Sequence, residues 1–222
     1  MGRSNQIEKN MKLTHSQEIA RNRILGSPRT IITGDRQTGK STLVLDVADQ
    51  WLKANDSSGS LDHIMVVSHN HSASIQLSER FIKSASDRDK NSFIQFGSVK
   101  RLLDDDRYIV GRKRVGILVD EAGYITNWDA NKALAAFAQH PNVTKFSMIS
   151  TPGPGEFFSE ILETCTNHGP WLRPLFVHYQ LECTDMDREY FRNTLYCRDP
   201  ELLDLLAQQQ DINQQIQRIL TK

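Results

Sequence analysis

The segment from Gly34 to Ser41 constrains the fold of this chain more than any other. It reads GDRQTGKS, which fits the pattern G-x-x-x-x-G-K-[ST], and it follows the β-branched run at 30–33. A run of that kind is typical of a buried parallel strand. In this pattern a loop joins a strand to a helix, and its backbone N–H groups point at phosphate oxygens. The segment therefore predicts a strand, a phosphate-binding loop and a helix, in that order.

The residue types in this loop match the parts of a nucleotide and its metal ion. Gly39 lets the backbone approach closely, Lys40 reaches the β- and γ-phosphates, and Ser41 offers a hydroxyl to Mg²⁺. The helix that begins here adds the positive end of its dipole. The predicted binding residues are Gly34, Asp35, Arg36, Gln37, Thr38, Gly39, Lys40, Ser41 and Thr42.

A second apolar run, at 117–119, leads directly into the acidic pair Asp120 and Glu121. Ligands gather at the carboxyl ends of strands in open α/β sheets, so we expect both carboxylates near the phosphate loop. Asp120 would then hold Mg²⁺ together with Ser41. Glu121 would orient the attacking water and take its proton. The alternative is an acidic corner between strand and loop that has no role in chemistry.

A third element, Ser150-Thr151-Pro152-Gly153, follows the apolar run at 145–150. Hydroxyls at the tip of a strand, fixed by proline, are placed to sense the γ-phosphate and pass on its loss. Taken alone, the segment is also ordinary turn chemistry. We therefore treat Ser150, Thr151 and Pro152 as coupling residues only in combination with the first two motifs.

The pattern along the chain alternates strands with helices, which predicts a mostly parallel sheet with helices on both faces. The expected strands span 30–33, 63–68, 93–99, 115–120, 145–150 and 175–181. The expected helices span 14–25, 40–53, 72–86, 131–140, 185–196 and 200–220, with a turn at 56–59. We divide the chain into a flexible tail at 1–12, a phosphate-loop core at 13–170, and a small lid with a polar, Gln-rich helix or linker at 171–222.

Composition removes several other classes of protein. The 222 residues carry 27 Lys+Arg and 27 Asp+Glu, so bulk electrostatic attraction to nucleic acid is excluded and any DNA contact must be local. Three cysteines without a C-x-x-C pair predict neither a disulfide framework nor a zinc site. No apolar run approaches the ~20 residues of a membrane span, and the N-terminus lacks a signal-peptide pattern. We expect an intracellular protein that is not membrane-bound.

Local basic clusters are the candidates for DNA contact. They are Lys100, Arg101, Arg112, Lys113 and Arg114. The alternative for each cluster is a solvated charged face. The acidic triplet at 104–106 lies between them, and we interpret it as a solvated loop rather than a metal site.

The order and spacing of these motifs resemble the ATPase domain of the large terminase subunit, the DNA-packaging motor of tailed bacteriophages. The resemblance covers 13–158, about two-thirds of the chain. It rests on six segments: Leu13–Gln17, Arg36–Ser41, Val66–Ser68, Phe96–Ser98, Gly111-Arg112 with Asp120–Ile125, and Ser150–Gly153. Phe96 departs from the pattern, because terminases have Asn there.

The resemblance implies a P-loop NTPase fold of the ASCE/RecA-like type that uses ATP and Mg²⁺. It implies that Gln17 reads the adenine edge and that Arg36 stabilises charge on the transferring phosphoryl group. Lys40 would act with Arg36, and Glu121 would be the catalytic base. A Gln on a surface helix is also commonplace, and Arg36 has the alternative of a residue that merely decorates the loop.

The resemblance also implies partners: double-stranded DNA, the portal protein and the small terminase subunit. The motor would form a homo-oligomeric ring when assembled, in the cytoplasm of the infected bacterium. Terminases usually continue into a nuclease with clustered carboxylates, and the acids after residue 170 lie in helical patterns instead. Two alternatives stay open: a helicase, and a nucleotide-gated assembly module with little hydrolysis.

Overall fold

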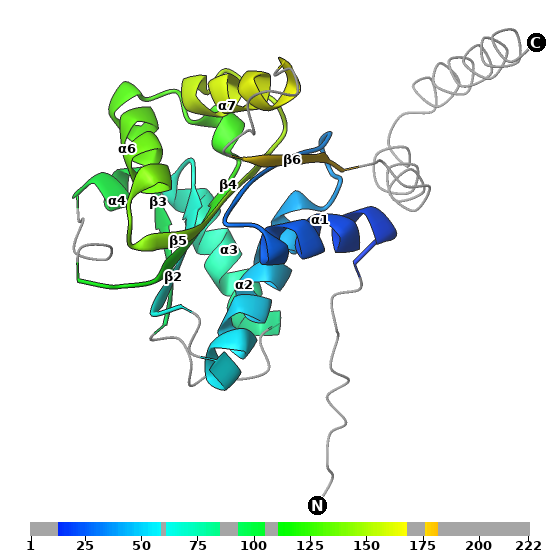
Figure 1. Cartoon of the computed structure of the whole chain (residues 1–222), viewed down its shortest axis with the longest axis vertical. Helices are drawn as coiled ribbons and strands as arrows, with labels where there is room; N and C mark the ends of the chain where they lie inside the picture. The colour runs from blue at the N-terminus through cyan, green and yellow to red at the C-terminus, as the bar shows by residue number, and fades with distance from the viewer. Residues whose placement is uncertain (1–12, 59–60, 85–92, 105–110, 168–175, 182–222) are drawn as a thin grey trace, which may run out of the picture. The chain divides into compact units, whose positions relative to one another are not determined.

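Six parallel strands form one sheet, in the order β3-β2-β4-β5-β1-β6 (Figure 1). The computed structural model describes residues 13–58, 61–84, 93–104, 111–167 and 176–181. The strands are β1 (Arg29–Thr33), β2 (His63–Ser68), β3 (Ile94–Ser98), β4 (Val115–Asp120), β5 (Val143–Ser150) and β6 (Val177–Gln180). One strand, β5, therefore separates β1, which leads into the phosphate loop, from β4, which ends at the acidic pair.

Helices cover both faces of this sheet. They are α1 (His15–Gly26), α2 (Lys40–Ser58), α3 (His71–Ser84), α4 (Val99–Asp104), α6 (Trp128–Gln139) and α7 (Glu156–Asn167), with a 3₁₀ turn η2 (Ala122–Tyr124) after β4. One core cluster joins α1, α2 and α3 to the sheet, and a second joins α6 and α7 to the other face. Ile32 belongs to the first cluster and its neighbour Ile31 to the second, because successive strand side chains point to opposite faces.

Burial explains why the strands read as unbroken apolar runs. Every residue of β2 and of β4 is buried, as expected for strands covered on both sides. All six predicted strands are present, each within about two residues of the expected bounds. The predicted mostly parallel sheet with helices on both faces is confirmed.

Helix bounds differ from the prediction at two places, and two further helices were not predicted. Helix α2 continues to Ser58, so the turn expected at 56–59 is wrong up to that residue. Helix α6 begins at Trp128 rather than 131, because the Asn127 side chain caps it by accepting a hydrogen bond from Ala130 N at 2.9 Å. Helices α4 and α7 were not predicted; α7 carries apolar residues at helical spacing, directly after a Gly- and Pro-rich turn.

The sheet extends past the predicted core boundary at residue 170. Strand β6 pairs with β1, with Val177 opposite Thr30. The predictions for the tail at 1–12, the acidic residues 105–106 and the helices beyond 182 lie outside the described residues. Among the helices that the structure describes, none is both long and apolar enough to cross a lipid bilayer.

Candidate active site

The phosphate loop and the acidic pair meet at the carboxyl edge of the sheet. Ser41, the second residue of α2, donates a hydrogen bond from Oγ to Asp120 Oδ2, the last residue of β4, at 3.0 Å. The two residues are 79 positions apart in the chain. The parallel sheet brings them together because β1 and β4 end at the same edge. This contact places the two motifs next to each other at one edge of the sheet.

The loop itself is tightly folded. Gln37 and Gly39 have left-handed backbones, with φ of 64° and 73°. Gly39 is required here for space as well, because a Cβ at this position would collide with the side-chain amide of Gln17. Both the hydroxyl and the N–H of Thr38 donate to Asp35 O, at 3.0 and 3.4 Å. The loop therefore has one defined shape, as phosphate binding by backbone N–H groups requires.

Lys40 is only 5% exposed and lies against its own loop. Its ammonium donates to Gly34 O at 3.1 Å and to Asp35 O at 2.6 Å. Burial lowers the pKa of Lys40, whereas the Glu121, Asp120 and Asp35 carboxylates oppose that shift. A buried cation satisfied by neutral carbonyls is well placed to exchange them for phosphate oxygens, which carry charge.

Asp120 is 4% exposed, and its two oxygens differ. Oδ2 accepts the Ser41 bond, whereas Oδ1 is buried and has no hydrogen-bond partner among the described residues. Burial raises the pKa of Asp120 to about 6, with Glu121 adding to the shift and Ser41 and Lys40 opposing it. A bound cation would offset the cost of a buried, half-satisfied carboxylate.

The donor set suits Mg²⁺. A hydroxyl and a carboxylate with one free oxygen are hard oxygen ligands, and Mg²⁺ is usually held by one or two such protein groups together with substrate phosphates and water. No group of three or more His, Cys, Asp or Glu residues that could hold a metal occurs in the described part of the chain. The chemistry of the Ser41–Asp120 pair, a hydroxyl beside a carboxylate with one buried oxygen that has no partner among the described residues, fits Mg²⁺.

Glu121 has an unusual backbone. Its φ of 57° and ψ of 37° are left-handed, which costs a non-glycine residue about 1–3 kcal/mol and is concentrated at functional sites. Its N–H donates to Ile149 O at 2.9 Å, so the turn is anchored to β5. The left-handed residue ends β4, and the Glu121 side chain is half-buried, with its charge acting on Lys40 of the phosphate loop.

Gln17 lies in α1 but belongs to this site. It is 5% exposed, so the alternative of an ordinary surface glutamine is wrong. Its Oε1 accepts from Thr14 N at 2.9 Å in a capping box, and its Nε2 donates to Thr38 O at 2.8 Å. Gln17 thus ties the start of α1 to the phosphate loop. That it also reads an adenine edge stays a prediction.

Three further residues frame the loop. Arg36 is exposed on it, as are its neighbours Asp35 and Gln37. Thr42 accepts a hydrogen bond from Arg80 Nη2 at 3.2 Å, and Arg80 comes from α3. Sequence reasoning did not find Arg80, because nothing in its helix distinguishes it from other solvent-facing charges.

Ser150 connects the loop to the acidic turn. Its Oγ accepts from Gly123 N at 2.9 Å and donates to Thr151 O at 2.7 Å, and its carbonyl accepts from Gly34 N at 3.2 Å. Pro152 is exposed and lines a cavity of about 390 Å³ beside Gly34, walled by β6 and α7. The predicted coupling segment therefore contacts both of the other motifs.

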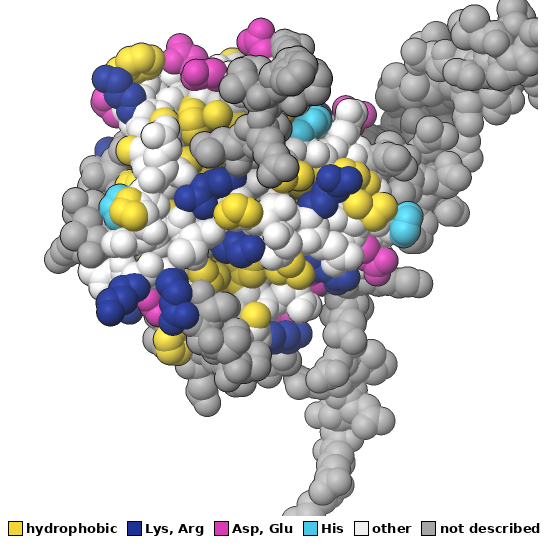
Figure 2. Space-filling model, viewed as in Figure 1, with side chains coloured by type: hydrophobic (Ala, Val, Ile, Leu, Met, Phe, Trp, Pro, Cys, Tyr) yellow, Lys and Arg dark blue, Asp and Glu magenta, His cyan; other side chains and the backbone are white. Residues whose placement is uncertain are grey.

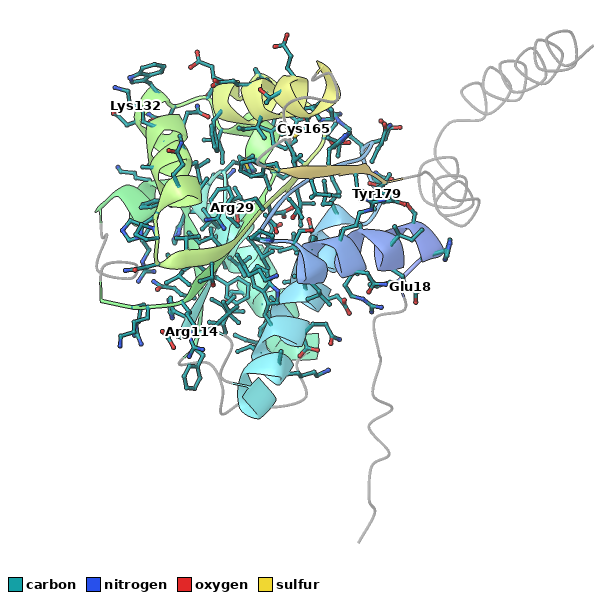
Figure 3. The ribbon with its side chains drawn as sticks, viewed as in Figure 1. Glu18, Arg29, Arg114, Lys132, Cys165 and Tyr179 are labelled. Atoms are coloured by element: carbon teal, nitrogen blue, oxygen red, sulfur yellow. The ribbon has the colours of Figure 1, made fainter. Side chains whose placement is uncertain are left out.

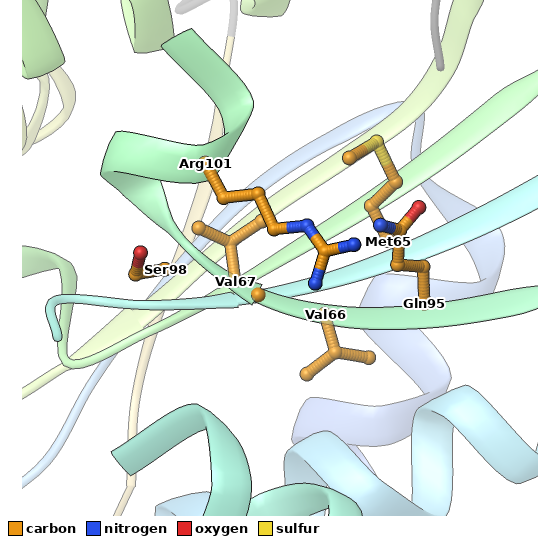
Figure 4. Close-up of a pocket in the computed structure, with 7 residues that line it drawn as sticks. Met65, Val66, Val67, Gln95, Ser98 and Arg101 are labelled. Carbon is orange, nitrogen blue, oxygen red and sulfur yellow. The ribbon is translucent and has the colours of Figure 1, made fainter. Parts of the chain in front are cut away.

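The two predicted basic clusters are not brought together. Lys100 and Arg101 lie on α4, which follows β3, whereas 112–114 precede β4 and so lie at the opposite edge of the sheet. The Arg101 guanidinium is directed along β2 and β3 towards Gln95 (Figure 4). Arg114 pairs with Asp62 at 3.1 Å.

The exposure of these basic side chains is compatible both with DNA contact and with an ordinary solvated charged face. All five side chains are exposed. On the face in Figure 2, Lys and Arg side chains lie in separate groups with apolar and uncharged ones between them. Figure 3 labels Arg114 at the lower left of the sheet, away from Lys132 and Cys165. DNA contact by these residues stays a prediction.

Comparison with solved structures places this site in a known fold. No family model matches the sequence, and none of the curated proteins compared with it does. The large-terminase ATPase domain of Thermus phage P74-26 is similar, with 15% identity, a TM-score of 0.55, and coverage of 86% of this chain and 90% of that one. The Hef helicase domain of Pyrococcus furiosus has 16% identity and a TM-score of 0.52 over 78% of this chain and 39% of that one. The described part of this chain therefore has the RecA-like fold of P-loop nucleoside triphosphatases.

Proposed function

We propose that this chain binds ATP with Mg²⁺ and hydrolyses it, as the motor ATPase domain of a terminase-type DNA-packaging machine. One observation carries the enzymatic part of this proposal. The Ser41 hydroxyl and the Asp120 carboxylate meet at 3.0 Å, beside a buried Lys40 and at the end of a tightly folded phosphate loop. These are the groups that phosphoryl transfer needs for binding phosphate and metal.

The residues divide the reaction as follows. Lys40 leaves its two carbonyl partners and neutralises the β- and γ-phosphates, and the loop N–H groups hold the same oxygens. Ser41 and Asp120 would hold Mg²⁺, which when bound would neutralise charge that develops on the phosphates. Glu121 orients a water for in-line attack on the γ-phosphorus and accepts its proton, while the bond from that phosphorus to the β–γ bridging oxygen breaks and ADP leaves. Arg36 adds positive charge to the transferring group.

Loss of the γ-phosphate would be sensed through Ser150. Its hydroxyl is bonded to Gly123 N in the acidic turn, and its carbonyl is bonded to Gly34 N at the start of the phosphate loop. A shift of either segment therefore displaces the other through one residue. Such a link is what a motor needs in order to convert hydrolysis into movement.

The packaging role rests on the order of the motifs and on how much of each similar structure this chain covers. The chain matches a terminase ATPase domain over 90% of that domain's length, but a helicase domain over only 39%. We propose double-stranded DNA, the portal protein, the small terminase subunit and further copies of this chain in a ring as partners. The setting would be the cytoplasm of an infected bacterium.

An assay with nucleic acid separates a packaging motor from a helicase. ATPase rate is measured with duplex DNA, with single-stranded DNA and with portal, and strand displacement is measured on a forked duplex. Stimulation by duplex DNA or portal without displacement supports packaging. Strand displacement driven by ATP contradicts it.

A nucleotide-gated assembly module is the second candidate. The observation that favours it is the exposure of Arg36, which leaves this side chain accessible to a second copy of the chain. ATPase rate per subunit, measured against protein concentration, decides between the two. A rate that stays near zero at every concentration, with and without DNA and portal, favours the assembly module.

A further inference from the structure

Asn131 is a buried polar residue that the proposed chemistry does not use. It lies in α6 and is 5% exposed. Its Nδ2 donates to Ile125 O at 2.9 Å and to Asn127 O at 3.0 Å, and its Oδ1 accepts from Phe157 N at 3.1 Å. Both N–H groups of the amide and one lone pair of its oxygen are therefore engaged. A side chain satisfied in this way has one orientation.

These three bonds join segments that lie far apart in the sequence. Ile125 ends the turn that starts at Glu121, a turn closed by bonds from Tyr124 N to Glu121 O and from Ile125 N to Ala122 O. Phe157 lies in the first turn of α7, where the backbone N–H groups have no partner within the helix. Asn131 therefore caps α7 from another helix and, with the same amide, holds the end of the Glu121 turn.

The same two segments are joined a second time by backbone packing. Gly155 N donates to Gly123 O at 2.7 Å. A Cβ at Gly123 would lie 2.5 Å from Thr151 O, and one at Gly153 would collide with Gly123 O. The acidic turn and the segment before α7 are thus packed backbone to backbone, with no room for a side chain between them.

The Glu121 turn and the start of α7 are attached at two different points. A single attachment would allow one to rotate against the other, whereas two attachments prevent this rotation. The glycine contact holds the start of α7 to the middle of the Glu121 turn, and Asn131 holds it to the end of that turn. Residues Ser159 and Leu162 of α7 line the cavity that borders Gly34 and Pro152. Movement of the turn with α7 attached would therefore change this cavity next to the phosphate loop.

We propose that Asn131 is a positioning residue that makes the Glu121 turn and the first turn of α7 one mechanical unit, so that a shift of Glu121 during turnover is carried to α7. The part about turnover rests on the proposed ATPase function. The part about the unit does not, because it concerns the protein without nucleotide. The two parts are measured separately.

The test compares Asn131→Leu with a matched core variant, Leu134→Ala. Leu134 is 1% exposed in the same helix, and no hydrogen bond to the turn depends on it. Asn131→Leu keeps the number and branching of the side-chain heavy atoms but removes the amide partners of Ile125 O and Phe157 N. Asn127 O still accepts from the backbone N–H of residue 131. Asn131→Ser, which retains a donor, is the milder variant if the leucine variant does not fold.

Amide hydrogen exchange of the nucleotide-free protein tests the unit. We expect exchange in 121–127 and in 153–159 to rise together in the Asn131 variant, by about tenfold relative to the rest of the sheet. In Leu134→Ala, exchange in these segments rises no more than in the rest of α6. If exchange rises in only one of the two segments, or in neither, the two segments do not form one mechanical unit held by Asn131.

Kinetics test the part about turnover. We expect Asn131→Leu to lower kcat by about tenfold or more, because small displacements of a catalytic group are costly, and to leave ATP affinity within about threefold. Leu134→Ala changes neither quantity per folded molecule. A kcat within threefold of the parent in Asn131→Leu overturns the positioning role. If the parent protein hydrolyses no ATP, the proposed function is wrong. The hydrogen-exchange result then still shows whether the Glu121 turn and the first turn of α7 move together.

Discussion

Ser41 and Asp120 are joined by a hydrogen bond of 3.0 Å across 79 positions of sequence. The bond leaves the second Asp120 oxygen buried and without a hydrogen-bond partner among the described residues. A metal ion at this point would be bound by a hydroxyl and a carboxylate that the fold already holds in place. Lys40, the residue before Ser41, completes the site with a cation that two loop carbonyls hold.

Replacing Lys40 tests the phosphate site. We expect Lys40→Ala to weaken ATP binding by about tenfold or more, because a charge-assisted contact to phosphate is worth about 1.5–3 kcal/mol. Titration calorimetry measures this. Lys53→Ala is the control, since Lys53 lies on the same helix, is 55% exposed and pairs with Asp49. Equal affinities in the parent and Lys40→Ala would exclude the phosphate-loop interpretation.

Gln17 provides a test of the link between α1 and the loop. Gln17→Ala removes the bond to Thr38 O and also opens the capping box, so we expect a loss of about 1–3 kcal/mol in the free energy of unfolding and weaker ATP binding. Thr14→Ala opens only the capping box and costs about 1 kcal/mol. Urea unfolding and ATP titration are measured on both variants. If Thr14→Ala weakens ATP binding as much as Gln17→Ala, the bond to Thr38 is not responsible.

Sequence reasoning found the strands and the site for the same physical reason. Strands β2 and β4 are buried on both faces, so their interior positions had to be apolar, and a loop that binds phosphate had to contain Gly39 and Lys40. Helix α7 was not predicted although its apolar residues recur at helical spacing, and the cap of its first turn, Asn131, lies 26 positions away. No local pattern records such a contact.

The same limit applies to Gln17 and to the basic clusters. The Gln17 side chain was expected to face a ligand, and its contact with Thr38 depends on how α1 packs beside the loop. The two basic clusters are close in sequence, but β4 runs between the edge where Arg112 lies and the edge with Asp120. A strand of this length separates its ends by about 17–20 Å.

Asp46 makes a prediction about pH. Burial raises its pKa above the ordinary value of 3.8; Arg21 and Lys53 oppose the shift, whereas Asp49 and Glu18 add to it. The folded protein then binds the proton more tightly than the unfolded chain, so this group costs stability as pH rises above 3.8. We expect Asp46→Asn to raise the free energy of unfolding at pH 7.

Urea unfolding of the parent and Asp46→Asn at pH 7 and near pH 4 measures this effect. The gain should shrink towards the lower pH, because the folded protein holds the Asp46 proton there and the unfolded chain begins to bind it as pH nears 3.8. The Arg21 guanidinium lies 3.8 Å from Asp46 and is the competing influence. A loss of stability at pH 7 would show that this ion pair outweighs burial.

The glycine contact makes a steric prediction. Gly123→Ala places a Cβ 2.5 Å from Thr151 O, a backbone atom that cannot move away alone, so we expect a loss of about 1–3 kcal/mol in the free energy of unfolding. Gly26→Ala is the control, because nothing lies within 4 Å of its added Cβ and it ends a helix. That variant should be neutral or more stable by about 0.5–1 kcal/mol. Similar losses in both, in thermal unfolding, would argue against close packing at Gly123.

Phosphate release from Mg²⁺-ATP by the parent and by Glu121→Gln tests the central claim most directly. The substitution keeps the size of the side chain and its left-handed backbone but removes the proton acceptor. We predict hydrolysis by the parent, a decrease of about 10²-fold or more in Glu121→Gln, and ATP affinity within about threefold in both. Near-normal turnover by Glu121→Gln would contradict the assignment of the base. A parent without hydrolysis at any concentration, with DNA and portal present, would contradict the ATPase function itself.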